Sequence, residues 1–419
     1  MAFETGKVEG AILRRAYLWN TMGSFLNAFQ SVFMLIIMTR VCDLTTAGVF
    51  TLAYANANLF LTMGNFGMRN YEASDVAPRF GFRAYSRSRA ITVTAMIVCS
   101  WAYLGYSAIT IGYSPEKIAA VALMTLFRAV DSLEDVFSGN FQQQGRLDVG
   151  ARQMTLRIGS TIIVFGLSIA VTRDLVLSTA IATAYGLVFM VSGLAWINRR
   201  FDLPAWHREA PEQHARNLLK ECLPLFIAAF LLFYVGNAPK YAIDAILDDV
   251  AQAQYGFIAM PVFVVGLLAQ MIYVPLVEPL SEMWDRGEKA EFLAQFRRQI
   301  VIIAIITVVC VAGAWLLGVP VLGWLYNTDL SSFRTELCIL VLGGGFLALA
   351  SLFTMGITVM RQQRKLVWGY VAVAVLAALA SPVLVRAFAI AGASYTYIGC
   401  MVILAAWFAL LFHRCSHRI

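Results

Sequence analysis

Charged residues are scarce in this chain: Asp, Glu, Lys and Arg make up 14% of the 419 residues, whereas 60% are hydrophobic. Soluble domains carry about 25% charged residues, so the composition excludes an ordinary soluble protein and predicts a chain that crosses a membrane many times. The alternating ten-residue pattern of membrane β-strands is also missing. Helices are therefore the spanning elements that we expect.

Histidine is rare and cysteine has no paired spacing. The four His residues fall in predicted loops or in the tail, and the seven Cys residues are scattered, so we expect neither a disulfide framework nor a metal site. No nucleophile–base pair and no glycine loop for phosphate stand out, which argues against an enzyme and against a cofactor. The first apolar run lacks a small-residue cleavage pattern, so we expect no cleavable signal peptide.

Long apolar runs are what the chain has instead. A helical span needs about 20 apolar residues, and runs of this length predict twelve transmembrane helices. They lie at about 12–38, 46–66, 90–112, 117–138, 153–172, 175–197, 222–246, 253–280, 299–318, 335–357, 366–385 and 391–412. The sequence thus predicts an all-α polytopic membrane protein with two six-helix lobes, at 1–197 and 222–419, joined by a linker at 198–221.

The Lys and Arg residues predict the orientation of these spans. If the N-terminus is cytoplasmic, most of the 32 Lys and Arg residues fall in segments on the cytoplasmic side. This asymmetry predicts that both termini lie inside and supports an even number of spans. A basic cytoplasmic face suits anionic membrane lipids. Because the basic residues are divided among many short segments, we do not expect nucleic acid as a partner.

The two halves resemble repeats of each other. Segment 143–147, after the fourth span, aligns with segment 362–366, after the tenth, and in this register Arg128 corresponds to Leu347. Both halves start on the same side, so the repeat is parallel. The interpretation is that the second half kept the scaffold, whereas the first half holds the chemistry.

Proline also distinguishes the halves. The first six spans contain no proline, whereas prolines in or at the edges of the later spans are Pro224, Pro239, Pro261, Pro275, Pro279 and Pro382. Proline removes a backbone hydrogen bond and permits a kink. We predict that spans seven and eight are the elements that bend.

Four ionisable side chains interrupt the fourth span, namely Arg128, Asp131, Glu134 and Asp135. A charge at the centre of a bilayer costs at least about 2.5–3.5 kcal/mol, so such residues face a protein interior or a wet cavity. Helical spacing places Arg128, Asp131 and Asp135 on one face, with Glu134 beside it. We interpret them as part of a transport pathway. The alternative is a neutralised Arg–Asp pair that holds two helices together.

Polar stripes at helical spacing predict a central hydrated cavity between the lobes. The candidate lining residues are Asn27 and Gln30 in the first span, Asn58 in the second, and Asn237, Tyr241 and Asp244 in the seventh. Cations are expected at its edges (Arg40, Arg69, Lys240) and in its wall (Arg128). Cations in a cavity favour an anionic cargo such as a phosphate. The acids, Asp244 among them, are candidates to hold Arg128 in place or to bind H⁺ or Na⁺.

Several segments resemble those of a known family. Segments 67–76, 142–149, 237–244, 255–257 and 392–393 are similar, in this order, to segments of the bacterial polysaccharide-transporter flippases, the Wzx-type members of the MOP superfamily. The likeness covers nearly the whole chain at the level of span order.

This resemblance implies a bacterial inner-membrane protein with inward-open and outward-open states. The implied cargo is a polyprenyl-diphosphate-linked oligosaccharide, which moves from the cytoplasmic to the outer leaflet for surface polysaccharide biosynthesis. Arg69, Arg128 and Lys240 are the candidate cationic contacts that it implies.

Three alternatives stay open. A multidrug exporter of the related MATE group shares the architecture, but it favours cationic drugs and would need acids without the balancing Arg128 and Lys240. A major-facilitator sugar transporter also has two six-span halves, but segment 67–89 does not match its loop motif. A membrane enzyme that joins polysaccharides would carry a large outer loop, and the longest one expected here, about 318–334, is short and has no His.

Overall fold

The computed structural model describes residues 2–74, 79–200 and 214–417, and these residues are mostly helical. Most of the segment predicted as the linker, residues 201–213, lies outside the described residues. The chain divides into two compact units, Met1–Phe230 and Leu231–Ile419. The division falls inside one continuous helix, α8 (Ala215–Ile246), which begins within the predicted linker.

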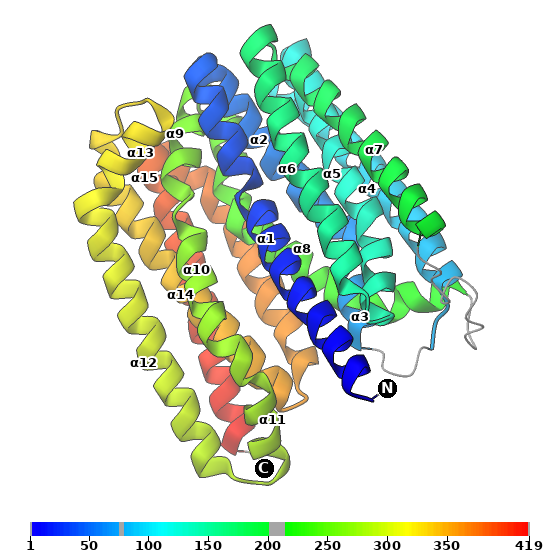
Figure 1. The fold of residues 1–419 in the computed structure, drawn as a ribbon. Coiled ribbons are helices and arrows are strands. Elements are labelled where there is room, and N and C mark those ends of the chain that lie inside the picture. The colour runs from blue at the N-terminus through cyan, green and yellow to red at the C-terminus, as the bar shows by residue number, and fades with distance from the viewer. Residues whose placement is uncertain (1, 75–78, 201–213, 418–419) are drawn as a thin grey trace. The chain divides into compact units, whose positions relative to one another are not determined.

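Unit 1 consists of long helices and one short one. They are α1 (Ala2–Val41), α2 (Leu44–Asn65), α3 (Met68–Ser74), α4 (Phe82–Ile111), α5 (Pro115–Gln143), α6 (Leu147–Thr172), α7 (Leu175–Arg200) and the first part of α8 (Figure 1). Local sequence explains where several begin. Asp43 caps α2 by accepting a hydrogen bond from the Thr46 amide at 3.0 Å. Ser114 caps α5 in the same way, directly before Pro115.

Unit 2 contains the rest of α8 and seven further α-helices. They are α9 (Asp249–Ala259), α10 (Val262–Tyr273), α11 (Val277–Asp285), α12 (Lys289–Gly313), α13 (Val319–Tyr326), α14 (Arg334–Val359) and α15 (Leu366–His417). A π-helical turn, Ala314–Gly318, joins α12 to α13. In α15, Ala389 has non-helical angles (φ 48°, ψ −127°), so this element is two helices that meet at a kink. Gly392 packs so closely on the Leu384 carbonyl that a side chain there would overlap it.

The predicted fold class is confirmed. Nine helical stretches of the described chain are long and apolar enough to cross a membrane. The other three predicted spans are α2, α5 and the second helix of α15. α2 and α5 carry polar residues within their length, and several of these, such as Asn56 and Ser132, are buried inside unit 1.

Proline breaks the predicted eighth span but not the seventh. α9 ends at Ala259 and α10 begins at Val262, so Pro261 lies in the break between them. A short 3₁₀ segment around Pro275 separates α10 from α11. In contrast, α8 continues through Pro224 and Pro239. Of the two spans predicted to bend, the eighth is therefore the one that is interrupted.

Each unit is built around one helix. In unit 1, α5 contacts α2, α3, α4, α6 and α7, and in unit 2, α14 contacts α9, α10, α11, α12 and α15. These are the two helices that the repeat register aligns. They pack differently, however: α14 carries three successive glycines, Gly343–Gly345, which allow close contact with neighbouring helices, whereas α5 carries the four charges.

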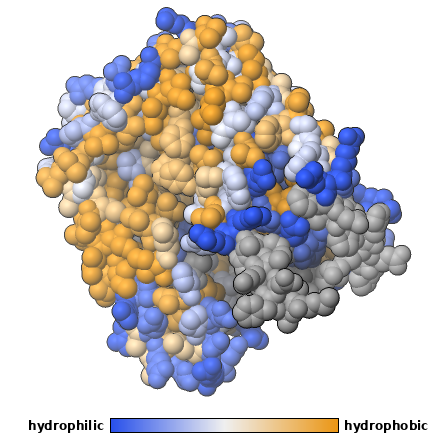
Figure 2. All heavy atoms as spheres, viewed as in Figure 1, coloured by the Kyte–Doolittle hydropathy of each residue, from blue (hydrophilic) through white to orange (hydrophobic). Residues whose placement is uncertain are grey.

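The surface outside these contacts is largely apolar. Along α12, the exposed side chains include Val301, Ile305, Val308 and Val309. Figure 2 shows large continuous areas of hydrophobic residues on the face that it presents. Extensive exposed apolar surface of this kind is expected of a protein that is solvated by lipid.

Candidate functional site

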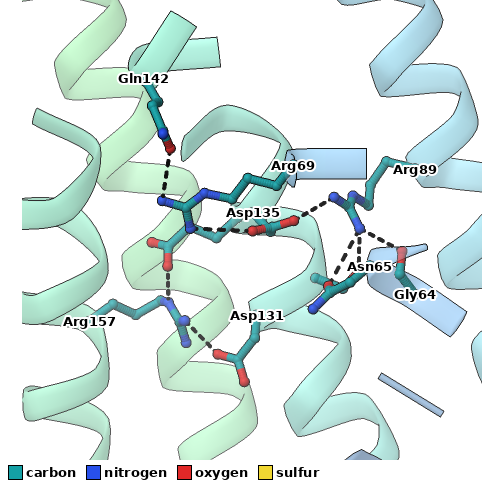
Figure 3. Close-up of polar contacts among 10 residues, drawn as sticks. Gly64, Asn65, Arg69, Arg89, Asp131, Asp135, Gln142 and Arg157 are labelled. Atoms are coloured by element: carbon teal, nitrogen blue, oxygen red, sulfur yellow. Dashed lines mark hydrogen bonds and ion pairs between the residues drawn. The ribbon is translucent and has the colours of Figure 1, made fainter. Parts of the chain in front are cut away.

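The four charges of α5 lie in the interior of unit 1, on the helix that the others surround. Because α5 contacts five other helices, charges on several of its faces meet protein rather than lipid. Asp131, Glu134 and Asp135 each contact an arginine, and the arginines come from four different helices. Figure 3 shows Arg69, Arg89 and Arg157 among these contacts. The contacts form two groups, and the buried Glu72 belongs to the second through its electrostatic interaction with Asp135, Arg89 and Arg69.

The α5–α6 ion group consists of Arg128, Asp131, Glu134 and Arg157. Asp131 Oδ2 is 2.5 Å from Arg128 Nη1, and Asp131 Oδ1 accepts a hydrogen bond from Arg157 Nη2 at 2.5 Å. Arg157 Nε donates a second hydrogen bond, to Glu134 Oε2 at 2.9 Å. The side chains of Arg157 and Glu134 are 2% and 3% exposed. Two guanidinium groups and two carboxylates thus neutralise each other inside the unit.

Arg128 is enclosed by polar and aromatic groups from two further helices. Its Nη1 donates to Gln30 Oε1 on α1 at 2.8 Å, and its guanidinium lies 5.3 Å from the centre of the Tyr54 ring on α2. Only 5% of the residue is exposed. The charge of Arg128 thus already has partners in Asp131 and Gln30, and its role in transport stays a prediction.

The α3–α4–α5 ion group consists of Arg69, Glu72, Arg89 and Asp135. Asp135 lies between two arginines, 2.6 Å from Arg89 Nη2 and 3.4 Å from Arg69 Nη1 (Figure 3). Arg89 also donates to the Gly64 carbonyl at 2.5 Å, at the end of α2. The group therefore ties α2, α3, α4 and α5 together.

Glu72 is the buried acid of this group on the short helix α3. It is 2% exposed, and its carboxylate lies so close to Gly139 of α5 that a side chain at that position would overlap it. Burial, reinforced by the charge of Asp135, raises the pKa of Glu72 to about 8, although Arg89 and Arg69 oppose the shift. Near neutral pH, Glu72 is consequently ionised in the unfolded chain and takes up a proton when the protein folds.

This proton uptake predicts how stability depends on pH. Between about pH 4.5 and 8, Glu72 holds a proton in the folded state but has released it in the unfolded state, where its pKa is the ordinary 4.5. The free energy of unfolding should therefore fall as pH rises through this range and level off above it. The slope is at most about 1.4 kcal/mol per pH unit. We expect the unfolding midpoint of the purified Glu72→Gln variant to change less between pH 6 and 8 than that of the wild type. Parallel curves for variant and wild type would contradict this assignment.

Three members of these groups were not among the residues predicted from the sequence. Arg89 and Arg157 were interpreted as charges of the cytoplasmic side, near the starts of predicted spans, and Glu72 as part of a loop motif. α4 begins at Phe82 and α6 at Leu147, so both arginines lie well inside helices. The number of charges could have indicated them. The fourth span contains three acids and one arginine, so neutralising the acids requires further cations from other helices.

The remaining predicted residues of unit 1 are spread over its surface and interior. Gln30 is fully buried against Arg128, and Asn58 is half-buried on α2. Asn27 and Arg40 are exposed on α1. Arg69, in the group above, keeps 28% of its side chain exposed. The structure therefore brings Gln30 into contact with Arg128, but it does not place Asn27, Asn58 and Arg40 in the same cluster.

The predicted residues of the seventh span lie on α8, in unit 2. Asn237 Nδ2 donates to the Phe233 carbonyl at 3.0 Å, Asp244 is buried, and Tyr241 is half-buried. Lys240 is half-buried and has no ion pair or hydrogen bond with any residue that the structure describes. It is thus a basic side chain on a membrane-spanning helix that no acid of the described chain neutralises.

A cavity of about 310 Å³ lies next to this part of α8, within unit 2. Tyr234 and Tyr241 stack at 6.2 Å between ring centres and line it from α8. The facing wall, from α15, includes Ser381, whose buried Oγ has no hydrogen-bond partner in the described chain, and the exposed Arg386. Polar groups and aromatic faces converge here, as they do in ligand sites.

Solved structures with the same fold are transporters. The chain superposes on an inward-facing multidrug resistance MATE family transporter of the MOP superfamily with a TM-score of 0.69, at 10% identity, over 93% of this chain and 95% of the other. It is also similar to the eukaryotic MATE transporter AtDTX14, with a TM-score of 0.65, 11% identity and coverage of 97% and 98%.

A third similar structure is a MOP superfamily transporter from Pyrococcus furiosus, described by the reverse polarity of its binding pocket, which suggests a different function for it. Its TM-score is 0.57, at 14% identity, over 97% of this chain and 96% of the other. No protein-family profile matches the chain, and a search of curated proteins found no match. The chain therefore has the fold of the MATE transporters of the MOP superfamily.

Proposed function

We propose that this protein is an alternating-access transporter that exports an anionic lipid, a polyprenyl-diphosphate-linked oligosaccharide, from the cytoplasmic to the outer leaflet. Its fold, shared with MATE transporters, supports transport as the activity. The order of the segments that resemble polysaccharide flippases supports the cargo. The proposed location is the bacterial inner membrane, with both termini in the cytoplasm, as the distribution of Lys and Arg favours.

Lys240 carries the proposal. A cation within a membrane-spanning helix costs free energy unless it is paired, and no described residue pairs with it. An anionic ligand would supply the missing partner. The ammonium of Lys240 is compact and can meet a diphosphate from several directions, and Tyr241 beside it offers an aromatic face for a sugar ring.

The charges of α5 argue against export of cations by unit 1. A site for a cationic drug needs a carboxylate that is not already neutralised. Asp131, Glu134 and Asp135 each contact a buried or half-buried arginine, so a cationic cargo would have to displace a guanidinium from each. The same pairing reduces their suitability as freely titrating sites. If a coupling ion, H⁺ or Na⁺, moves inward during export, we expect it to exchange with one of these arginine contacts.

The sign of the voltage dependence tests the charge of the cargo. A diphosphate carries about two negative charges, and each gains about 2.3 kcal/mol per 100 mV when it leaves a negative compartment. We expect a negative interior to accelerate outward movement of a fluorescent polyprenyl-diphosphate oligosaccharide in proteoliposomes. A coupled inward cation would change the rate in the same direction. Acceleration by a positive interior would argue against an anionic cargo.

A further inference from the structure

A second cavity, of about 380 Å³, lies within unit 1 where α6 begins and α7 ends. It belongs to neither ion group. Side chains from α1, α6, α7 and the turn before α6 line it: Arg15, Trp19, Arg146, Asp148, Val149, Arg152 and Trp196. The Lys and Arg distribution assigns this end of the helices to the cytoplasmic side of the membrane.

The cavity has an excess of positive charge. Three arginines line it against a single acid, Asp148, whose carboxylate accepts two hydrogen bonds from Arg146, at 2.9 and 3.2 Å. Arg15 and Arg152 are exposed, and neither forms an ion pair with a described residue. Two guanidinium groups therefore remain available to an anion, and the start of α6 adds the positive end of a helix dipole.

Two tryptophans, Trp19 and Trp196, indicate that the cavity lies at the level of the lipid headgroups. Arg152 lies 5.9 Å from the centre of the Trp19 ring, and Trp196 is 52% exposed. Tryptophan concentrates at the boundary between headgroups and acyl chains. α1 and α6 lie close together here: the Thr155 hydroxyl of α6 is 3.0 Å from the Trp19 carbonyl of α1 and 2.7 Å from the Ala151 carbonyl of its own helix, and it can donate to either one.

Apolar residues continue from the cavity along the same helices. Leu18 and Met22 follow Arg15 at helical spacing on α1, and Leu156 follows Arg152 on α6; all three are exposed. A ligand that fits both surfaces has an anionic headgroup and hydrocarbon chains. A soluble anion would use the arginines and leave the apolar surface uncovered.

The geometry points to a binding site for an anionic membrane phospholipid in the inner leaflet, with its phosphodiester held by Arg15 and Arg152. Trp19 and Trp196 flank the headgroup, and the acyl chains lie along α1 and α6. Basic pockets between membrane helices on the cytoplasmic side bind such headgroups in general. This site is distinct from the one proposed for the exported cargo, because its residues come from α1, α6, α7 and the turn before α6, and none of them lies on α8.

Lipid binding to the purified full-length protein tests this site. Native mass spectrometry and the shift in unfolding midpoint are measured with cardiolipin and with zwitterionic phosphatidylcholine. We expect cardiolipin to bind and stabilise, and phosphatidylcholine to do neither. Arg15→Gln with Arg152→Gln should weaken cardiolipin binding about tenfold or more. The matched control is Arg297→Gln with Arg298→Gln, which removes two exposed cations of α12 and should leave binding unchanged.

Three outcomes would overturn the site. Equal losses in the two double variants would show attraction to the overall basic surface, and equal binding of phosphatidylcholine would remove the role of the anion. Inorganic pyrophosphate is added to wild-type protein as a soluble competitor. We expect it not to displace cardiolipin at equal concentration, and full displacement would indicate a site for a soluble anion. This last arm does not depend on the folding of any variant.

Discussion

Replacing Arg157 by Gln should leave little folded protein. The substitution leaves Glu134, whose side chain is 3% exposed, without the cation that neutralises it, and leaves Asp131 with Arg128 alone. Removing one partner of a buried ion pair costs about 3–5 kcal/mol, a large part of the 5–15 kcal/mol that typically separates folded from unfolded states. The yield of monodisperse protein and its unfolding midpoint measure the effect.

Two controls make this prediction specific. Glu134→Gln added to Arg157→Gln restores the charge balance of the α5–α6 ion group, and we expect it to recover most of the lost stability. Arg286→Gln removes an exposed pair with Glu282 on α11 and should cost about 1 kcal/mol or less. If Arg157→Gln behaves like Arg286→Gln, or if the double variant is no more stable than the single, the ion group does not stabilise unit 1.

Replacing Lys240 by Met should have the opposite pattern, a loss of transport without a loss of stability. Since Lys240 has no partner among the described residues, removing its charge removes no contact and relieves a desolvation cost. A hydrogen bond to a charged ligand contributes about 1.5–3 kcal/mol, so transport should fall roughly 10- to 150-fold. Lys240→Arg keeps the charge and should retain more activity. A Met variant that transports normally, or that fails to fold, would contradict the role proposed for this lysine.

These two substitutions separate two kinds of buried charge. Arg69, Arg89, Arg128 and Arg157 lie at close range to Asp131, Glu134 and Asp135, and this arrangement explains how α5 can carry these charges inside unit 1. The α5–α6 ion group is neutral and therefore gives no preference for the sign of a cargo. In our proposal the preference for an anion comes from Lys240 of α8, which has no ion pair or hydrogen bond with a residue that the structure describes.

Local spacing explains what could be predicted from the sequence. Apolar runs of spanning length predicted the helices, because a membrane requires that length. The pairing of Arg128 with Asp131 also followed from sequence, since residues three apart on a helix are neighbours. Asp135, assigned to the same face, instead pairs with Arg69 and Arg89.

Contacts between helices explain what could not be predicted. Arg157 meets Glu134 from 23 positions away and Arg89 meets Asp135 from 46, so the pairing depends on how α4 and α6 are rotated against α5. Periodicity does not determine that rotation when several faces of a helix are buried. For the same reason, the sequence did not distinguish Arg128, which is paired, from Lys240, which has no ion pair or hydrogen bond within the described ranges.

Transport of two cargoes by the same proteoliposomes tests the central claim, that the cargo is an anion, most directly. One is a polyprenyl-diphosphate-linked oligosaccharide carrying a fluorophore, and the other is the cationic dye ethidium. We predict that the wild-type protein moves the lipid and not the dye, and that Lys240→Met loses movement of the lipid. Movement of ethidium, with no movement of the lipid, would contradict the claim and favour a cation exporter.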